Sequence, residues 1–161
     1  MMSNPTPAHD HTGLIPHLVC SPGTDAIEFY KKAFGAEEIS RVMSPDGKRL
    51  MHGEVLIGGQ PLFLADDFPE YCGGKSQTAT ALGGTPVTIH RFVDDCDAAI
   101  AQAEKAGATV KMPAADMFWG DRYGVVTDPF GHCWSFGTHI KDLTPEEVVQ
   151  GMNEAFAQSG H

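Results

Sequence analysis

Apolar and polar residues follow a fixed order in the first half of the chain. The apolar run at 14–20 predicts a buried strand, and residues 26–34 have helical spacing. Thr24 and Asp25 are candidate N-caps for that helix, and Gly35 can end it because glycine tolerates positive φ. Three more strands are predicted, separated by two glycine-containing turns. The helix buries one face, formed by Ile27, Tyr30 and Phe34.

The second half repeats this order of strand, helix and three strands. An offset of 72 residues aligns Gly35 with Gly107, at the end of each helix. The same offset aligns Gly59 with Gly131, in the turn before each last strand. The repeat predicts an α+β fold of two βαβββ modules.

Composition shifts and turn residues predict the domain boundaries. The stretch before the second module is rich in Gly, Ser and Thr, which is typical of a linker. The predicted segments are a flexible arm at 1–13, a first module at 14–67, a linker at 68–85, a second module at 86–142, and a C-terminal helix and tail at 143–161. His9 and His11 fall in the arm, and we do not expect them to act as ligands.

The C-terminal segment has clear helix signals. Thr144 is a suitable N-cap, Pro145 suits the first helical position, and Glu147 can complete a capping box. Val148, Met152 and Phe156 then share one face. We expect this face to pack on the domain or on a partner subunit.

Charge narrows the range of partners. The 161 residues contain 11 Lys and Arg against 21 Asp and Glu, for a formal charge of -10. A surface this acidic repels nucleic acids and anionic membranes, and we therefore expect neither of them as a partner. No apolar run approaches the roughly 20 residues of a membrane span, and the first residues do not resemble a signal peptide. We expect a cytoplasmic protein with reduced cysteines.

Four motifs carry a family resemblance. They are AIEFYKKAFGAEE at 26–38, MHGEVLIGG at 51–59, PLFLADD at 61–67, and MPAADMFWGDRYGVVTDPFGHCWSF at 112–136. These motifs resemble the vicinal oxygen chelate superfamily, which includes glyoxalase I, extradiol dioxygenases, and the fosfomycin and bleomycin resistance proteins. The PhnB-like branch is the most similar. The resemblance spans about Leu14 to Asp142 and implies a glyoxalase-like fold, with a curved mixed sheet around a small-molecule cavity.

The resemblance also implies where a metal would bind. Metal-dependent relatives take four His, Glu or Gln ligands from the first and last strands of the two modules. Strand alignment puts those slots at Ile15, Phe63, Thr88 and Ser135. Isoleucine and phenylalanine cannot bind a metal, and the two hydroxyls are weak ligands. The usual metal site is therefore expected to be lost, and no ion is expected there.

Strand alternation brings a second set of polar residues to the cavity face. Residues two apart on a strand share a face, so His17 follows Ile15 and His90 follows Thr88. His52 and Glu54 should face the same cavity. Three interpretations remain open: a displaced Zn, Fe, Ni or Mn site, metal-free proton transfer or substrate contact, and a structural role. The candidate catalytic residues are Glu54, His17 and His90.

A loop near the predicted cavity mouth supplies substrate-binding candidates. Arg122 offers a planar fork for a carboxylate or phosphonate, and Trp119 offers a flat wall. Asp121 and Ser135 complete this set. The alternative is that Asp121 and Arg122 pair with structural groups and Trp119 packs in the core.

Two functions follow from these residues. The first is an enzyme of isomerase, lyase or dioxygenase type that acts on a small oxygenated metabolite. The second is a metal-free protein that binds or sequesters a small molecule, as the bleomycin resistance proteins do. We also expect a homodimer, because a four-stranded module leaves sheet edges that need cover.

Overall fold

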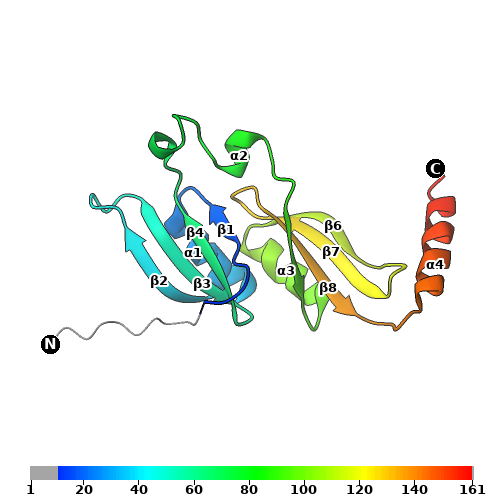
Figure 1. Ribbon diagram of the computed structural model, residues 1–161. Helices are drawn as coiled ribbons and strands as arrows, with labels where there is room; N and C mark the ends of the chain where they lie inside the picture. The colour runs from blue at the N-terminus through cyan, green and yellow to red at the C-terminus, as the bar shows by residue number, and fades with distance from the viewer. Residues whose placement is uncertain (1–10, 161) are drawn as a thin grey trace. The chain divides into compact units, whose positions relative to one another are not determined.

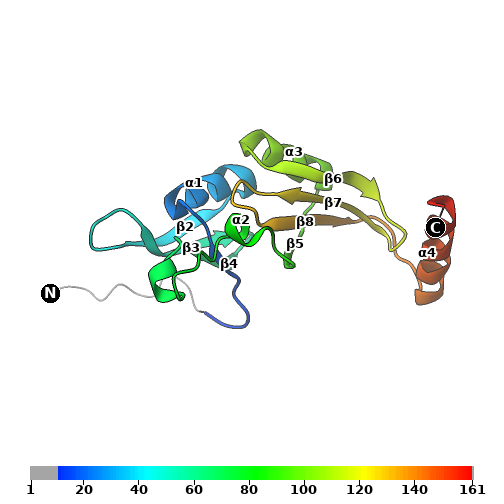
Figure 2. The same ribbon diagram turned by 90° about the horizontal axis from the view of Figure 1, so that it is seen from above.

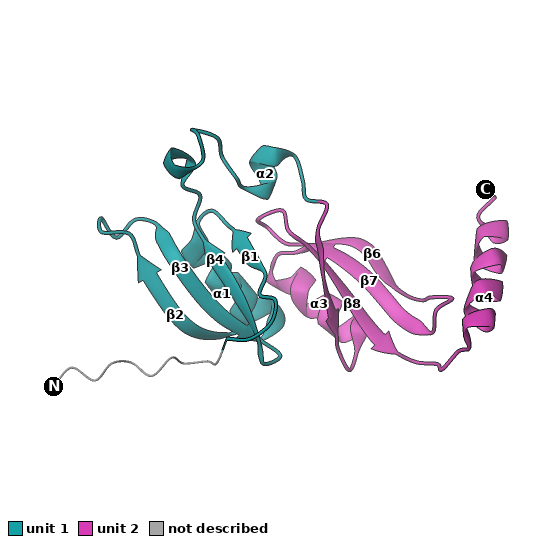
Figure 3. Cartoon of the chain, in the orientation of Figure 1, with its two compact units in different colours: residues 1–85 teal, residues 86–161 magenta. Residues whose placement is uncertain are grey.

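The structure is a computed structural model that describes residues 11–160, so residues 1–10 of the predicted arm lie outside the described part. The chain divides into two units, 1–85 and 86–161, drawn in teal and magenta in Figure 3. The first unit contains β1 (His17–Val19), α1 (Gly23–Phe34), β2 (Glu37–Met43), β3 (Leu50–Ile57) and β4 (Gln60–Ala65). Its sheet order is β1-β4-β3-β2, and only the β1–β4 pair is parallel.

The second unit has the same topology (Figure 1). It contains β5 (Thr88–Phe92), α3 (Cys96–Ala106), β6 (Thr109–Asp116), β7 (Asp121–Thr127), β8 (Cys133–His139) and α4 (Pro145–Gln158). Its sheet order is β5-β8-β7-β6, again with only the first-strand pair, β5–β8, parallel. The α+β class and the two βαβββ modules are therefore confirmed.

One face of each sheet is covered by the helix of its own unit, as Figures 1 and 2 both show. In the first unit, Ile27 and Tyr30 of α1 are fully buried against Val55 and Leu64. A Cβ on Gly53 would lie 3.1 Å from the Ile27 side chain, so glycine lets α1 approach β3 closely. The predicted helical face is confirmed.

In the second unit, α3 packs its buried Ile100 over the sheet residues Trp134 and Phe136. A buried carboxylate holds the turn between β7 and β8 together. Asp128 accepts hydrogen bonds from the backbone N–H groups of Phe130 and His132 and from the Trp134 indole, each at 2.9 Å. The long motif at 112–136 is thus partly a folding motif, because this carboxylate satisfies buried donors.

The helix ends show which sequence signals decided the local structure. Gly35 adopts φ 66° and ends α1, as predicted. The N-cap prediction at Thr24 and Asp25 was wrong: α1 begins at Gly23, and no side chain caps it. Thr144 and Glu147 form the predicted capping box of α4. However, no α4 residue is buried, so its apolar face lies exposed on this chain.

The predicted linker contains short ordered elements. A 3-10 turn spans Pro69–Tyr71, and α2 spans Ala79–Leu82, capped by the Thr78 side chain. Ala79 is buried, which ties this segment to its unit. Within residues 11–160, no helix has the length and apolar character that would let it cross a membrane.

Candidate functional site

The open face of the first sheet, opposite α1, carries most of the candidate site. Leu18, Leu62 and Leu64 alternate toward α1 and are buried. Residues between them therefore point to the other face, where His17 lies beside Phe63 in the β1–β4 register. Glu54 lies opposite Phe63 in the β3–β4 register, as expected.

Phe63 is the centre of a ring of imidazoles on this face. The His52 ring lies 4.7 Å from the Phe63 ring, and the His17 ring lies 6.1 Å from it, both edge to face. His11 contacts the same ring at 5.3 Å. The phenyl group thus lies among the three imidazoles, and each of them contacts it edge to face.

Glu54 is a buried acidic residue on this face. Its side chain is only 7% exposed, and its Oε1 lies 2.8 Å from His11 Nε2. The end of the predicted arm therefore lies on the sheet, where His11 pairs with Glu54; the expectation that His11 is not a ligand stays a prediction. A carboxylate this buried needs a donor, and His11 provides one.

The protonation of His17 is set by its surroundings. Partial burial lowers the pKa of His17 below its ordinary value of 6.5, and the neighbouring His52 lowers it further. The two rings lie 6.1 Å apart, so a charge on one disfavours a charge on the other. A neutral imidazole at His17 can accept or donate a hydrogen bond near neutral pH.

The open face of the second sheet carries His90 and Ser135. His90 Nδ1 lies 2.7 Å from Ser135 Oγ, and the Ser135 side chain is buried. The His90 ring stacks on Tyr123 at 5.9 Å and rests over Gly137, where a Cβ would come within 3.0 Å of it. Trp119 extends the aromatic surface, 5.4 Å from Tyr123.

In the strand registers, the first-strand partners of Phe63 and Ser135 lie two residues beyond the expected slots. Ile15 precedes β1, and His17 takes the place beside Phe63. Thr88 pairs with Cys133 and donates to its sulfur at 3.4 Å, whereas His90 stands beside Ser135. A shift of two residues keeps the same face, so alternation alone could not reveal it.

Within either unit, the described donors are not gathered into a metal site. Among residues 11–160, no three His, Cys, Asp or Glu side chains are grouped as a metal would need. The Phe63 ring lies between the imidazoles of the first unit. The Glu54 carboxylate is already hydrogen-bonded to His11. Neither unit by itself therefore gathers a donor set for a divalent ion among its described residues. The displaced set of His17, His52, Glu54 and His90 stays a prediction.

The Arg122 side chain lies on the helix-covered face of the second sheet. Its guanidinium pairs with Asp97 of α3, and its Nη1 lies 2.9 Å from Asp116 Oδ1. Both carboxylates hold the pKa of Arg122 well above its usual range, Asp97 more strongly. Asp121 contacts His139 at 3.1 Å. These contacts favour the structural interpretation of Asp121 and Arg122, while Trp119 remains partly exposed.

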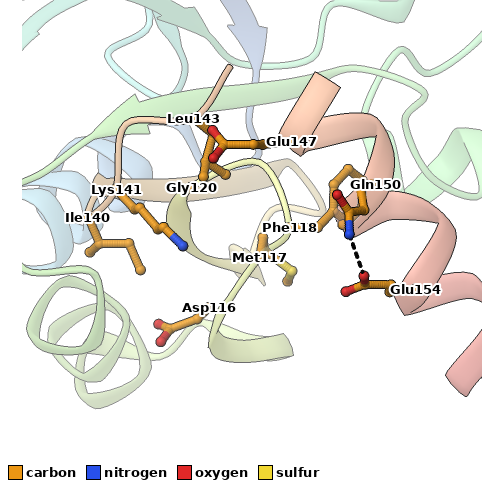
Figure 4. Close-up of a pocket in the computed structure, with 11 residues that line it drawn as sticks. Asp116, Met117, Phe118, Gly120, Ile140, Lys141, Leu143, Glu147, Gln150 and Glu154 are labelled. Atoms are coloured by element: carbon orange, nitrogen blue, oxygen red, sulfur yellow. Dashed lines mark hydrogen bonds between the residues drawn. The ribbon is translucent and has the colours of Figure 1, made fainter. Parts of the chain in front are cut away.

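A separate pocket of about 380 Å³ lies beneath α4 (Figure 4). The turn before β7, the segment after β8 and α4 form its walls, with Phe118, Lys141 and Glu154 among the lining residues. Gly120, at φ 96°, forms part of the floor, and its N–H donates to Met117 O at 3.1 Å. None of the predicted site residues lines this pocket.

Sequence reasoning missed two members of these faces. Tyr123 was passed over beside Arg122, although strand alternation puts only one of them on the face of Ser135. Strand alternation could not have pointed to His11, because this residue lies in no strand or helix. A pattern of alternating side chains cannot place a residue in irregular backbone.

Comparisons with known proteins agree with this fold. The family model of the Glyoxalase/Bleomycin resistance protein/Dioxygenase superfamily matches residues 10–136. An uncharacterized protein of Mycobacterium tuberculosis is 52% identical over 140 residues, covering 87% of this chain and 82% of the relative.

Solved structures show the same architecture. The X-ray structure of a gene product from Arabidopsis thaliana has a TM-score of 0.61 at 29% identity, covering 80% of this chain and 98% of that one. TioX from Micromonospora sp. ML1 has a TM-score of 0.61 at 24% identity, covering 81% of this chain and 100% of that one. The chain therefore belongs to the glyoxalase/bleomycin resistance protein/dioxygenase superfamily.

Proposed function

We propose that this protein is a small-molecule enzyme that transfers protons on an oxygenated metabolite with its own side chains. The observation that carries this proposal is the buried carboxylate of Glu54, surrounded by imidazole and aromatic rings on an open sheet face. Isomerase and lyase reactions of this kind need a base and an acid close to one small substrate.

Glu54 acts as the base in this proposal. Its side chain is 7% exposed and its Oε1 lies 2.8 Å from His11 Nε2, so the carboxylate has a fixed position from which to remove a substrate proton. His17, held neutral near its neighbour His52, serves as the hydrogen-bond donor or acid. On the second unit, a hydrogen bond with Ser135 fixes the His90 imidazole ring, which suits that face for a small-molecule contact of its own.

Proton exchange tests the reaction without a known substrate. The protein is incubated in D2O with a panel of small α-hydroxycarbonyl compounds, and deuterium incorporation is followed by NMR. A removed general base costs roughly 10²- to 10⁴-fold in rate, so Glu54→Gln should abolish detectable exchange. His139→Gln, an exposed histidine of the other unit, is the control. Exchange that survives in Glu54→Gln and requires an added divalent ion would refute the proposal.

The second candidate is a small-molecule binding protein. The aromatic surface of the second unit favours it, since His90, Tyr123 and Trp119 form adjoining ring contacts suited to a flat apolar molecule. Native mass spectrometry distinguishes the two functions. A binding protein would retain its ligand chemically unchanged, and Glu54→Gln would leave the retained amount unaltered.

Three broader assignments belong to the same proposal. The motifs at 51–59 and 112–136 support placement in the PhnB-like branch. The acidic composition supports action on a small molecule rather than on nucleic acid, and the scattered cysteines, without a C-x-x-C pair, support a reducing compartment such as the cytoplasm. The exposed apolar side chains of α4 support a homodimer.

A further inference from the structure

We propose that the Glu54 face of the first unit binds a small planar ring with an N–H donor, and that His11 of the same chain occupies this site until such a ligand displaces it. The proposal rests on the assignment of this face as the functional site. It adds a segment of the chain that competes for this face, and a class of ring ligand that would displace the segment without being the substrate.

His11 makes the contacts that such a ligand would make. Its Nε2 lies 2.8 Å from Glu54 Oε1, which is a hydrogen-bond distance. Its ring meets the Phe63 ring edge to face, with centroids 5.3 Å apart and planes at 90°. One polar contact and one aromatic contact thus define the orientation of a flat ring on this face.

The burial of the two partners differs, and this asymmetry points to a replaceable occupant. The Glu54 side chain is 7% exposed, whereas the His11 side chain is 42% exposed. The carboxylate belongs to the sheet and cannot leave. It needs a donor in every state, because an unpaired buried charge is strongly disfavoured. A ligand that displaces His11 must therefore bring its own donor.

The backbone around His11 permits this exchange. Residues 11–16 form no helix or strand. The segment is fixed at its other end, where Phe63 N–H donates to Pro16 O at 2.9 Å. His11 can therefore leave the face while Pro16 stays in place. The space it vacates has the size of an imidazole ring.

The neighbouring side chains limit what else can enter. The His52 and Phe63 rings are 4.7 Å apart, and the His17 and His52 rings are 6.1 Å apart. These rings provide aromatic edges and faces, which favour a flat ligand over a branched one. Within residues 11–160, the hydrogen bonds and ring contacts of this face involve one carboxylate and no Lys or Arg, so an N–H donor suits it better than an anion.

Imidazole is the probe for this site. It is titrated into His11→Ala and into the natural protein at a pH above the imidazole pKa, where the probe is neutral. The aromatic NMR signals of Phe63 and His52 report binding. 1-Methylimidazole is the matched probe, because its neutral form has the same ring and no N–H donor. His139→Ala, which removes an exposed histidine from the other unit, is the matched protein control.

Imidazole should shift the Phe63 and His52 signals of His11→Ala. The natural protein and His139→Ala should bind about tenfold more weakly, since a segment that occupies a site nine-tenths of the time reduces apparent affinity by that factor. 1-Methylimidazole should leave the signals unchanged. Adding Glu54→Gln to His11→Ala should weaken binding about fivefold or more, because a neutral acceptor makes a weaker bond.

Three results would overturn the proposal. They are equal binding by His11→Ala and the natural protein, equal binding of the two probes, and no effect of Glu54→Gln in a protein whose thermal unfolding is unchanged. Failure here leaves the proposed function standing if Glu54→Gln still abolishes proton exchange on the α-hydroxycarbonyl panel. Loss of both results would show instead that Glu54 is a structural residue.

Discussion

Arg122 and Asp97 join β7 to the start of α3, with Arg122 Nη2 2.9 Å from Asp97 Oδ1. The next residue, Tyr123, points to the opposite face and stacks on His90. Two consecutive residues of β7 therefore differ in role: Arg122 binds α3, whereas Tyr123 faces the candidate site. This relationship favours the structural interpretation of Arg122.

Arg122→Ala should lower the thermal unfolding temperature and leave small-molecule binding on the open face intact. The guanidinium connects α3 with β6, and its loss leaves Asp97 and Asp116 close together without a cation. Because these groups are partly exposed, the loss should be larger at low salt than at high salt. A melting temperature that does not depend on salt, together with weaker ligand binding, would restore Arg122 to the site.

Ser135→Ala should destabilise the protein by roughly 1 kcal/mol, the usual contribution of one hydrogen bond. The buried hydroxyl lies 2.7 Å from His90 Nδ1, within hydrogen-bond distance. Its removal should also change the tautomer balance of His90, which 15N chemical shifts measure. Ser159→Ala, whose hydroxyl bonds Phe156 O near the chain end, is the control and should change stability by less than about 0.5 kcal/mol.

The fold could be predicted from the sequence because its signals are local. The turn at Gly59 and the helix end at Gly35 both require positive φ, and both residues adopt it. Apolar alternation then assigns each strand a helix-covered face, since an exchange of faces would expose residues such as Leu64. Such signals act over a few residues and do not depend on distant contacts.

The candidate site could be predicted only in part, because register and irregular backbone are not local properties. Alternation placed His17 and Glu54 on one face, but the strand pairing that puts His17 beside Phe63 needs the folded sheet. His11 reaches Glu54 across 43 residues of sequence. No periodic pattern encodes a contact of that kind.

His17 should make stability fall as the solution becomes acidic. Its folded pKa lies below 6.5, so between that pKa and 6.5 the unfolded chain binds more protons than the folded protein. Stability is therefore lost as pH falls from 6.5 through the folded pKa. Urea unfolding between about pH 7.5 and about pH 5 should show a smaller loss in His17→Gln than in the natural protein.

His139 serves as a control, because its effect on the pH dependence of stability has the opposite sign to that of His17. Asp142, and then Asp121, raise the pKa of His139 above 6.5. Its contribution is present below 6.5 and is lost as pH rises through the folded pKa. His139→Gln should thus remove stability at acidic pH, where His17→Gln restores it. Parallel pH profiles for the two variants would contradict both assignments.

Gly120→Ala should destabilise the protein more than Gly59→Ala does. Both glycines have positive φ, 96° and 78°, which costs an alanine about 1–2 kcal/mol. A Cβ at Gly59 meets nothing within 4 Å, whereas a Cβ at Gly120 would overlap the carbonyl oxygen of Lys141. We expect about 1 kcal/mol for Gly59→Ala and roughly 2–3 kcal/mol more for Gly120→Ala, measured by chemical denaturation. Equal losses would show that the Gly120 turn can yield to the added methyl group.

Phe156→Glu should convert a dimer into a monomer without changing the fold of either unit. Phe156 is 57% exposed and Met152 is 36% exposed, and no residue of α4 is buried on this chain. An amphipathic helix with an uncovered apolar face is favoured at a subunit contact, and a buried glutamate there would be costly. Light scattering at micromolar concentration should give twice the chain mass for the natural protein and the single chain mass for the variant. Gln158→Glu adds the same charge on another side of α4, and should leave the dimer intact. A natural protein that scatters as a monomer would remove the dimer from the proposal, and a Phe156→Glu variant that remains dimeric would place the contact away from α4.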